Sequence, residues 1–264
     1  MTAIPLSRLA GALLLAAILA FALLGPLLID ADPLRQNLRA TLRPPSGEFL
    51  LGTDHLGRSM LARLASAARL SLGLAAAAVL LAGVIGTALA ALAAAARGRA
   101  ADRALSGLCD ATMALPGLLT VVLIAALAPG QLWPLYAGLV ATQWVEFFRP
   151  VRAFAAGRLA APDVEAARLF GFGGWHVFRR HLLPELAPLI GTLAAFGVAS
   201  AVLAVSTLSF VGIGLRPPTP ELGSMMVELL PHYADAPWQL LAPAALIFAT
   251  VLGLRLVASA GDEA

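Results

Sequence analysis

Residues 165–184 read EAARLFGFGGWHVFRRHLLP and form a polar, arginine-rich island between long apolar runs. The whole chain has 264 residues, of which 60% are hydrophobic and only 12% are charged, and its mean hydropathy is +0.87. Soluble domains carry about 25% charged residues, so this composition is typical of a polytopic membrane protein. The island is then expected to be an extramembrane loop of such a protein.

Working outward from the island, six apolar segments predict an all-α fold with about six transmembrane helices in one transmembrane domain, residues 1–264. A spanning helix needs roughly 20 mostly apolar residues. The fourth segment is the shortest, because only 14 uncharged residues precede Glu146. The first apolar segment contains a possible signal-peptide cleavage site. Its apolar run is longer than the 7–15 residues usual for a signal peptide, so an uncleaved helix is favoured. The predicted spans are residues 9–29, 70–96, 105–129, 132–148, 186–214 and 236–255.

The basic residues predict the orientation. All 18 are arginines. Six lie between the fourth and fifth spans and three between the second and third, so the positive-inside rule makes both links cytoplasmic. Both termini are then cytoplasmic, with membrane lipid as a partner. The first link, which also has six arginines, would lie outside against the rule. A nucleic-acid partner is not expected, because the arginines occupy short segments between apolar runs.

Two acidic residues in or beside the apolar segments could have a functional role. Asp110 and Glu146 are costly within a membrane and are often functional there, although a structural place near a helix end is favoured for both. Glu146 and Arg149, three residues apart, could pair on one helix face. The single Cys109 allows no intrachain disulfide, and the four histidines give no convincing metal-ligand set. No metal site and no catalytic residue are predicted.

The cytoplasmic island, residues 163–184, is expected to fold as two short helices joined at a glycine-rich elbow. Asp163 would cap the first helix, and Pro184 would end the second. Exposed aromatic and arginine side chains are typical of a protein interface. An amphipathic segment lying on the anionic inner leaflet is the alternative.

The spacing of the island resembles the EAA loop of permease subunits of ATP-binding-cassette (ABC) importers. That pattern is E-A-A, three residues, G, nine residues, I, one residue, L-P. His181 stands at the Ile position, as is common in the dipeptide, oligopeptide and nickel branch of the family. The resemblance implies that the island couples the chain to an ATPase through Glu165, Ala166, Ala167, Arg168, Gly171, His181, Leu183 and Pro184.

Further segments resemble signatures of the same branch, so that the likeness runs from about residue 8 to residue 255. The segment GTDHLGR at 52–58 lacks only the usual following Asp, replaced by Ser59. The segment LSFVGIG at 208–214 precedes PPTPE at 217–221, where Leu222 replaces the usual Trp. The usual C-terminal tail motif is missing, which leaves ATPase contacts by the tail in doubt. The signature positions are Gly52, Thr53, Asp54, Gly57, Arg58, Asp110, Pro116, Ser209, Phe210, Gly212, Gly214 and Pro218.

The resemblance implies a type I importer permease with a MetI-like fold. It implies as partners a second homologous permease, two ATP-binding subunits and an extracytoplasmic substrate-binding protein. The cargo would be peptides, nickel or a related small solute. The chain has no G-x4-G-K-[ST] motif and no lysine to build one, so it is expected to bind no cofactor, with ATP and Mg²⁺ on the partner subunits. A secondary transporter or a channel-like protein without an ATPase is the alternative function.

Overall fold

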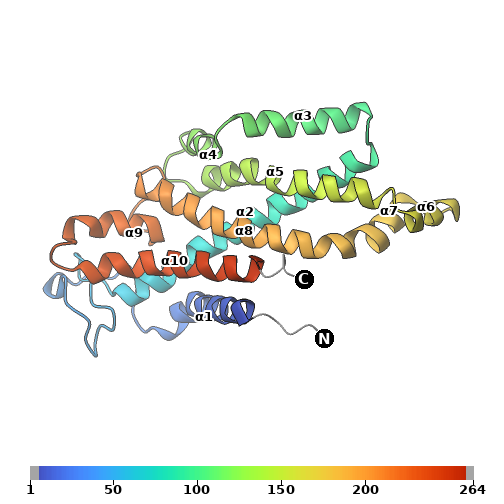
Figure 1. Ribbon diagram of the computed structural model, residues 1–264. Helices are drawn as coiled ribbons and strands as arrows, with labels where there is room; N and C mark the ends of the chain where they lie inside the picture. The colour runs from blue at the N-terminus through green and yellow to red at the C-terminus, as the bar shows by residue number, and fades with distance from the viewer. Residues whose placement is uncertain (1–5, 260–264) are drawn as a thin grey trace.

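The computed structural model describes residues 6–259, and the regular structure in this range consists of helices (Figure 1). The long helices are α1 (Leu6–Leu28), α2 (Met60–Ala95), α3 (Ala100–Ala114), α4 (Gly117–Ala125), α5 (Leu132–Arg158), α8 (Leu183–Phe210) and α10 (Pro237–Ser259). The short helices are η1 (Leu38–Ala40), α6 (Pro162–Leu169), α7 (Gly174–Val177), η2 (Phe178–Leu182), α9 (Leu222–Leu229) and η3 (Leu230–His232). The all-α expectation is confirmed.

Within residues 6–259, four helical stretches are long and apolar enough to cross a membrane: residues 6–28, 60–95, 174–210 and 237–258. Helices α3 and α4 would add a fifth crossing as a pair bent by 82°. The bend lies at Pro116, because a residue before proline avoids the helical region, and Leu115 is extended with a ψ of 134°. Helix α5 is long enough to span but carries Glu146, Arg149 and Arg152, and it does not meet the same test. Six crossings therefore remain a prediction.

Small residues allow the long helices to pack closely. A Cβ on Gly86 of α2 would lie 2.4 Å from the Trp144 carbonyl oxygen of α5. A Cβ on Gly11 of α1 would lie 2.7 Å from the Leu256 Cβ of α10. Such close approaches drive helix association in lipid, where apolar surface gains little from burial. The helices consequently form one bundle, in which α2 and α8 cross the middle and α1 lies beside α10 (Figure 1).

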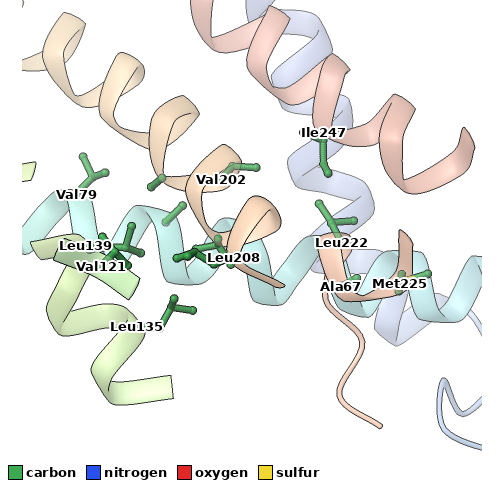
Figure 2. Close-up of a cluster of buried hydrophobic side chains, with 14 of the residues drawn as sticks. Ala67, Val79, Val121, Leu135, Leu139, Val202, Leu208, Leu222, Met225 and Ile247 are labelled. Carbon is green, nitrogen blue, oxygen red and sulfur yellow. The ribbon is translucent and has the colours of Figure 1, made fainter. Parts of the chain in front are cut away.

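The core of the bundle joins helices that are distant in sequence. Figure 2 shows side chains from α2, α4, α5, α8, α9 and α10 meeting in one apolar cluster. Val79 of α2 and Leu139 of α5 are almost fully buried there, as is Val202 of α8. This cluster holds α5 and α8 together, and both helices continue to the end of the molecule that carries the island.

Candidate functional site

The island forms a protrusion at one end of the bundle, between the end of α5 and the start of α8 (Figure 1). Helix α6 begins with Ala161 as its N-cap and Pro162 at its first position, so the expected cap by Asp163 is wrong. Proline suits that position because its missing N–H would have no partner there. Asp163 lies in the first turn instead, and its carboxylate is used in ion pairs.

Gly171 forms the elbow after α6. Its φ of +83° lies in the left-handed region that favours glycine. The Gly171 N–H donates to the Arg168 carbonyl at 2.9 Å, and the Phe172 N–H donates to the Ala167 carbonyl at 3.1 Å. These two bonds make a Schellman motif, which ends the helix and reverses the chain.

The second half of the island does not end at Pro184 but continues into a membrane helix. Residues 174–210 form one helical stretch, in which η2 is a π-helical turn. The Leu183 N–H reaches back five residues to the Phe178 carbonyl. The wider turn lies just before Pro184, which has no N–H to donate and whose ring crowds the preceding turn. The π turn therefore allows the helix to pass through the proline.

An ion-pair network, here called the elbow network, ties the island to the bundle. Arg158, at the end of α5, makes a fork to Asp163 with two hydrogen bonds of 2.6 Å, and its Nε lies 2.6 Å from Glu185 Oε2. His181 Nδ1 lies 3.0 Å from Asp163 Oδ2. The hydrogen bonds from Arg158 hold the pKa of the Asp163 carboxyl well below its usual value. Sequence reasoning missed Arg158, Asp163 and Glu185 as a set, although charges five residues apart across a helix break were a usable signal.

The outer surface of the island is apolar and cationic. Leu169 is 83% exposed, Phe170 80% and Trp175 70%. Within α6, Glu165 and Arg168 are exposed, Ala166 is half-buried and Ala167 is buried. His181 is half-buried within the elbow network, and Leu183 and Pro184 are exposed at the start of α8. Large exposed apolar side chains outside an expected membrane segment indicate a docking surface. This surface is called the docking cap below and consists of Leu169, Phe170, Phe172 and Trp175 with Arg168, Arg179 and Arg180.

The GTDHLGR signature, residues 52–58, forms a compact turn just before the first residue of α2. A Cβ on Gly57 would lie 1.8 Å from the Asn37 carbonyl oxygen, and the φ of this residue is +71°, so no other residue fits. The Thr53 hydroxyl donates to the Ala40 carbonyl and accepts from the Arg43 N–H at 3.0 Å. Gly52 accepts the Met60 N–H at 3.1 Å, just after Ser59 has capped α2.

Asp54 is the centre of a buried charge cluster, here called the outer network. It accepts from the Arg58 N–H at 2.9 Å, from Arg58 Nε at 2.6 Å and from Arg63. Both arginines also bind Glu228 of α9, at 2.7 and 2.9 Å. Burial raises the pKa of Asp54, but the Arg58 hydrogen bonds and the Arg63 charge outweigh burial and lower it overall. Arg63 and Glu228 were not predicted, because nothing in the sequence pairs residues 165 positions apart.

His55 stacks on His232 at 5.1 Å beside the outer network. Ligand atoms of Asp54, His55 and Glu228 lie within 4.8 Å of one another. Both carboxylates are already neutralised by arginines, so this donor set does not favour a metal cation.

The remaining signature residues lie elsewhere in the fold. Ser209 is buried near the end of α8, Phe210 and Gly212 are exposed, and Gly214 packs so closely on Ser209 that a Cβ would lie 2.1 Å from its Oγ. Pro218 is exposed in the next link. Asp110 pairs with Arg149 at 2.5 Å, so the expected pairing of Glu146 with Arg149 is wrong. Pro116 separates α3 from α4. The signature positions thus lie apart from the docking cap and form no single site with it.

Comparison with known proteins gives a consistent picture. Residues 86–260 match the family described as "Binding-protein-dependent transport system inner membrane component". A "Putative peptide transport system permease protein" of Brucella suis biovar 1 is 35% identical over 248 residues, which cover 94% of this chain and 83% of the relative. A "Probable D,D-dipeptide transport system permease protein" of Escherichia coli K12 is 31% identical over 93% of this chain and 82% of its own length.

A solved structure supports the fold. The MetNI methionine ABC transporter, in an inward-facing conformation, contains a chain that matches with a TM-score of 0.56 at 20% identity, covering 73% of this chain and 90% of that one. At this identity the likeness is one of fold. It agrees with the MetI-like architecture expected from the sequence.

The family assigns the chain to the membrane component of an importer, whose ATP hydrolysis takes place on separate subunits and which works with ATP-binding and substrate-binding partners. The several apolar helices make it a multi-pass membrane protein. The chain is a permease subunit of ABC importers and belongs to the family of binding-protein-dependent transport system inner membrane components.

Proposed function

We propose that this permease carries peptides across a bacterial cytoplasmic membrane, with both termini and the island on the cytoplasmic side. The relatives from Brucella and Escherichia, which are named as peptide and dipeptide permeases, favour peptides over nickel. Arginine placement supports the orientation, because nine arginines lie in the two links that would be cytoplasmic.

The observation that supports coupling of this permease to an ATPase is the docking cap. It presents Phe170 and Trp175 to solvent, outside the apolar segments, on a helix break held by the elbow network. A rigid, exposed aromatic surface rimmed by arginines is the composition of an interface hot spot. In this proposal Glu165 and Arg168 make polar contacts with the ATPase and Gly171 supplies the turn.

The complete assembly would contain this chain, a second homologous permease, two ATP-binding subunits and an extracytoplasmic binding protein that delivers the peptide. ATP and Mg²⁺ would bind the ATP-binding subunits, and this chain would hold no cofactor. Its sequence supports this division, because it lacks the lysine that contacts nucleotide phosphates in a P-loop.

The test is ATP-dependent peptide uptake by the assembled transporter in proteoliposomes. Replacing Trp175 with Ser should reduce uptake about tenfold or more, since a hot-spot aromatic is worth roughly 2 kcal/mol or more. The ATP-binding subunits should also fail to co-purify with the Trp175→Ser permease. Trp133→Ser is the matched control, because Trp133 is 58% exposed at the start of α5, far from the island.

Uptake that persists without ATP and follows an ion gradient would instead support a secondary transporter. Equal losses in the Trp175 and Trp133 variants would show that the docking cap has no special part in coupling.

A further inference from the structure

We infer that Glu146 and Gln143 form a weak binding site for a protonated amino group of the cargo, in a cavity between α4, α5 and α8. The inference rests on the proposed peptide cargo and adds a polar contact within the path that the cargo takes. It concerns a cavity remote from both the docking cap and the outer network.

The cavity has a volume of about 300 Å³ and lies between α4, α5 and α8. Glu146 is 14 residues from the first residue of α5 and 12 from the last, so it lies at the middle of that helix. The polar residues that line the cavity are Thr142, Gln143, Glu146 and Ser200.

Glu146 is exposed and has no ion-pair partner within residues 6–259. The nearby Arg149 binds Asp110 at 2.5 Å instead. A carboxylate facing lipid at this depth would cost several kcal/mol, about 2.5–3.5 on insertion scales. The face that carries Glu146 is therefore expected to border water or a cationic group and not lipid.

Gln143 provides an independent sign of a missing ligand. Its side chain is only 7% exposed, and its Nε2 donates to the Gly197 carbonyl at 3.3 Å. Its Oε1 is buried without a hydrogen-bond partner. Buried acceptors are rarely left unpaired, because each costs roughly 1–3 kcal/mol. Because Gln143 lines the same cavity as Glu146, a donor bound there would give this buried oxygen the partner that it lacks.

The hydrogen-bonding groups that line the cavity indicate which kind of ligand it would bind. A carboxylate and an amide oxygen accept hydrogen bonds, and the Thr142 hydroxyl donates its own hydrogen to the Gly138 carbonyl at 3.0 Å, which leaves its oxygen as a further acceptor. An ammonium group has a positive charge and three donors and no acceptor, so it matches this set. Peptides carry such a group at their amino terminus. A cationic side chain of the second permease has the same chemistry and must be distinguished by experiment.

The experiment uses the assembled transporter with Ser200→Cys as a reporter inside the cavity. The native Cys109 is buried, and the parent protein gives its background rate. Relative to their rates with a free thiol in solution, a cationic thiosulfonate should label the reporter about tenfold faster than an anionic one of equal size, because the Glu146 carboxylate attracts the cation. Adding Glu146→Gln should bring the ratio of the two rates close to the ratio for the free thiol. A peptide with a free amino terminus should slow labelling, and its N-acetylated form should not.

Several results would overturn the inference. Labelling rates unchanged by Glu146→Gln, or equal protection by the acetylated peptide, would exclude an ammonium site. Loss of the second permease from the purified Glu146→Gln complex would assign the carboxylate to a subunit contact. All of these outcomes leave ATP-dependent uptake by the unaltered protein intact, so they differ from a failure of the proposed function, in which that uptake would be absent.

Discussion

At the scale of single residues, Gly171 is required for its backbone and not for lack of space. Nothing lies within 4 Å of a Cβ built there, and the φ is +83°. Gly171→Ala should therefore strain the elbow by about 1–2 kcal/mol without any clash. We expect a several-fold loss of coupled uptake and faster amide exchange in α6, measured in proteoliposomes and by hydrogen exchange.

Gly173→Ala is the matched control for this change. Gly173 also has open space around its Cβ position, but its φ is −72°, which any residue adopts. The control should behave as the parent protein does. Similar defects in both variants would indicate that chain flexibility, and not the left-handed turn, matters at the elbow.

At the scale of elements, helix α6 is placed by the fork between Arg158 and Asp163. The folded-state pKa of Asp163 lies below its usual value of 3.8. The fork is therefore fully stabilising above pH 3.8 and is lost only as the pH falls through the lower folded value. With His181 replaced by Gln, which removes the histidine contact to Asp163, amide protection in α6, corrected for intrinsic exchange, should be constant between about pH 5 and 8.

Asp163→Asn should lower protection in α6 at neutral pH, because the neutral amide cannot make the charged fork to Arg158. Asp235→Asn offers a control, since Asp235 is exposed in the link before α10. Protection in the Asp163 variant equal to that of the parent would mean that α6 is held by its own buried side chains, Val164 and Ala167.

The sequence allowed the elements to be predicted where a local pattern sets them. Apolar runs indicated where long helices lie, but the predicted helix over residues 105–129 is divided into α3 and α4, and α2 begins at Met60, before the predicted span 70–96. The Gly171 spacing located the elbow. Pro184 was misread as a helix end, whereas a π turn just before it lets the helix continue. Glu146 was paired with Arg149 from spacing alone, whereas Asp110 reaches Arg149 from another helix. Contacts of this kind depend on how helices meet, which a single sequence does not reveal.

At the scale of the whole molecule, the outer network fastens the segment before α2 to α9. Glu228 is the only acidic partner that Arg58 and Arg63 have on α9 among residues 6–259. Glu228→Gln should leave both buried arginines with Asp54 alone and destabilise the fold by about 3–5 kcal/mol. Thermal unfolding in detergent should show a lower midpoint, and residues 30–59 should lose amide protection first. The exposed Glu48→Gln should change neither, and a matching loss there would contradict this account.

The unbroken helix from residue 174 to residue 210 has a mechanical consequence. Trp175 at the docking cap and Ser200 at the midpoint cavity lie on the same helical stretch, about 37 Å apart at 1.5 Å per residue. Rocking such a rod by about 5° displaces one of these points by about 3 Å relative to the other. The π turn at residues 178–182 and Pro188 lie between these two points, so part of such a movement of the ATPase would be taken up as bending there before it reached the cavity.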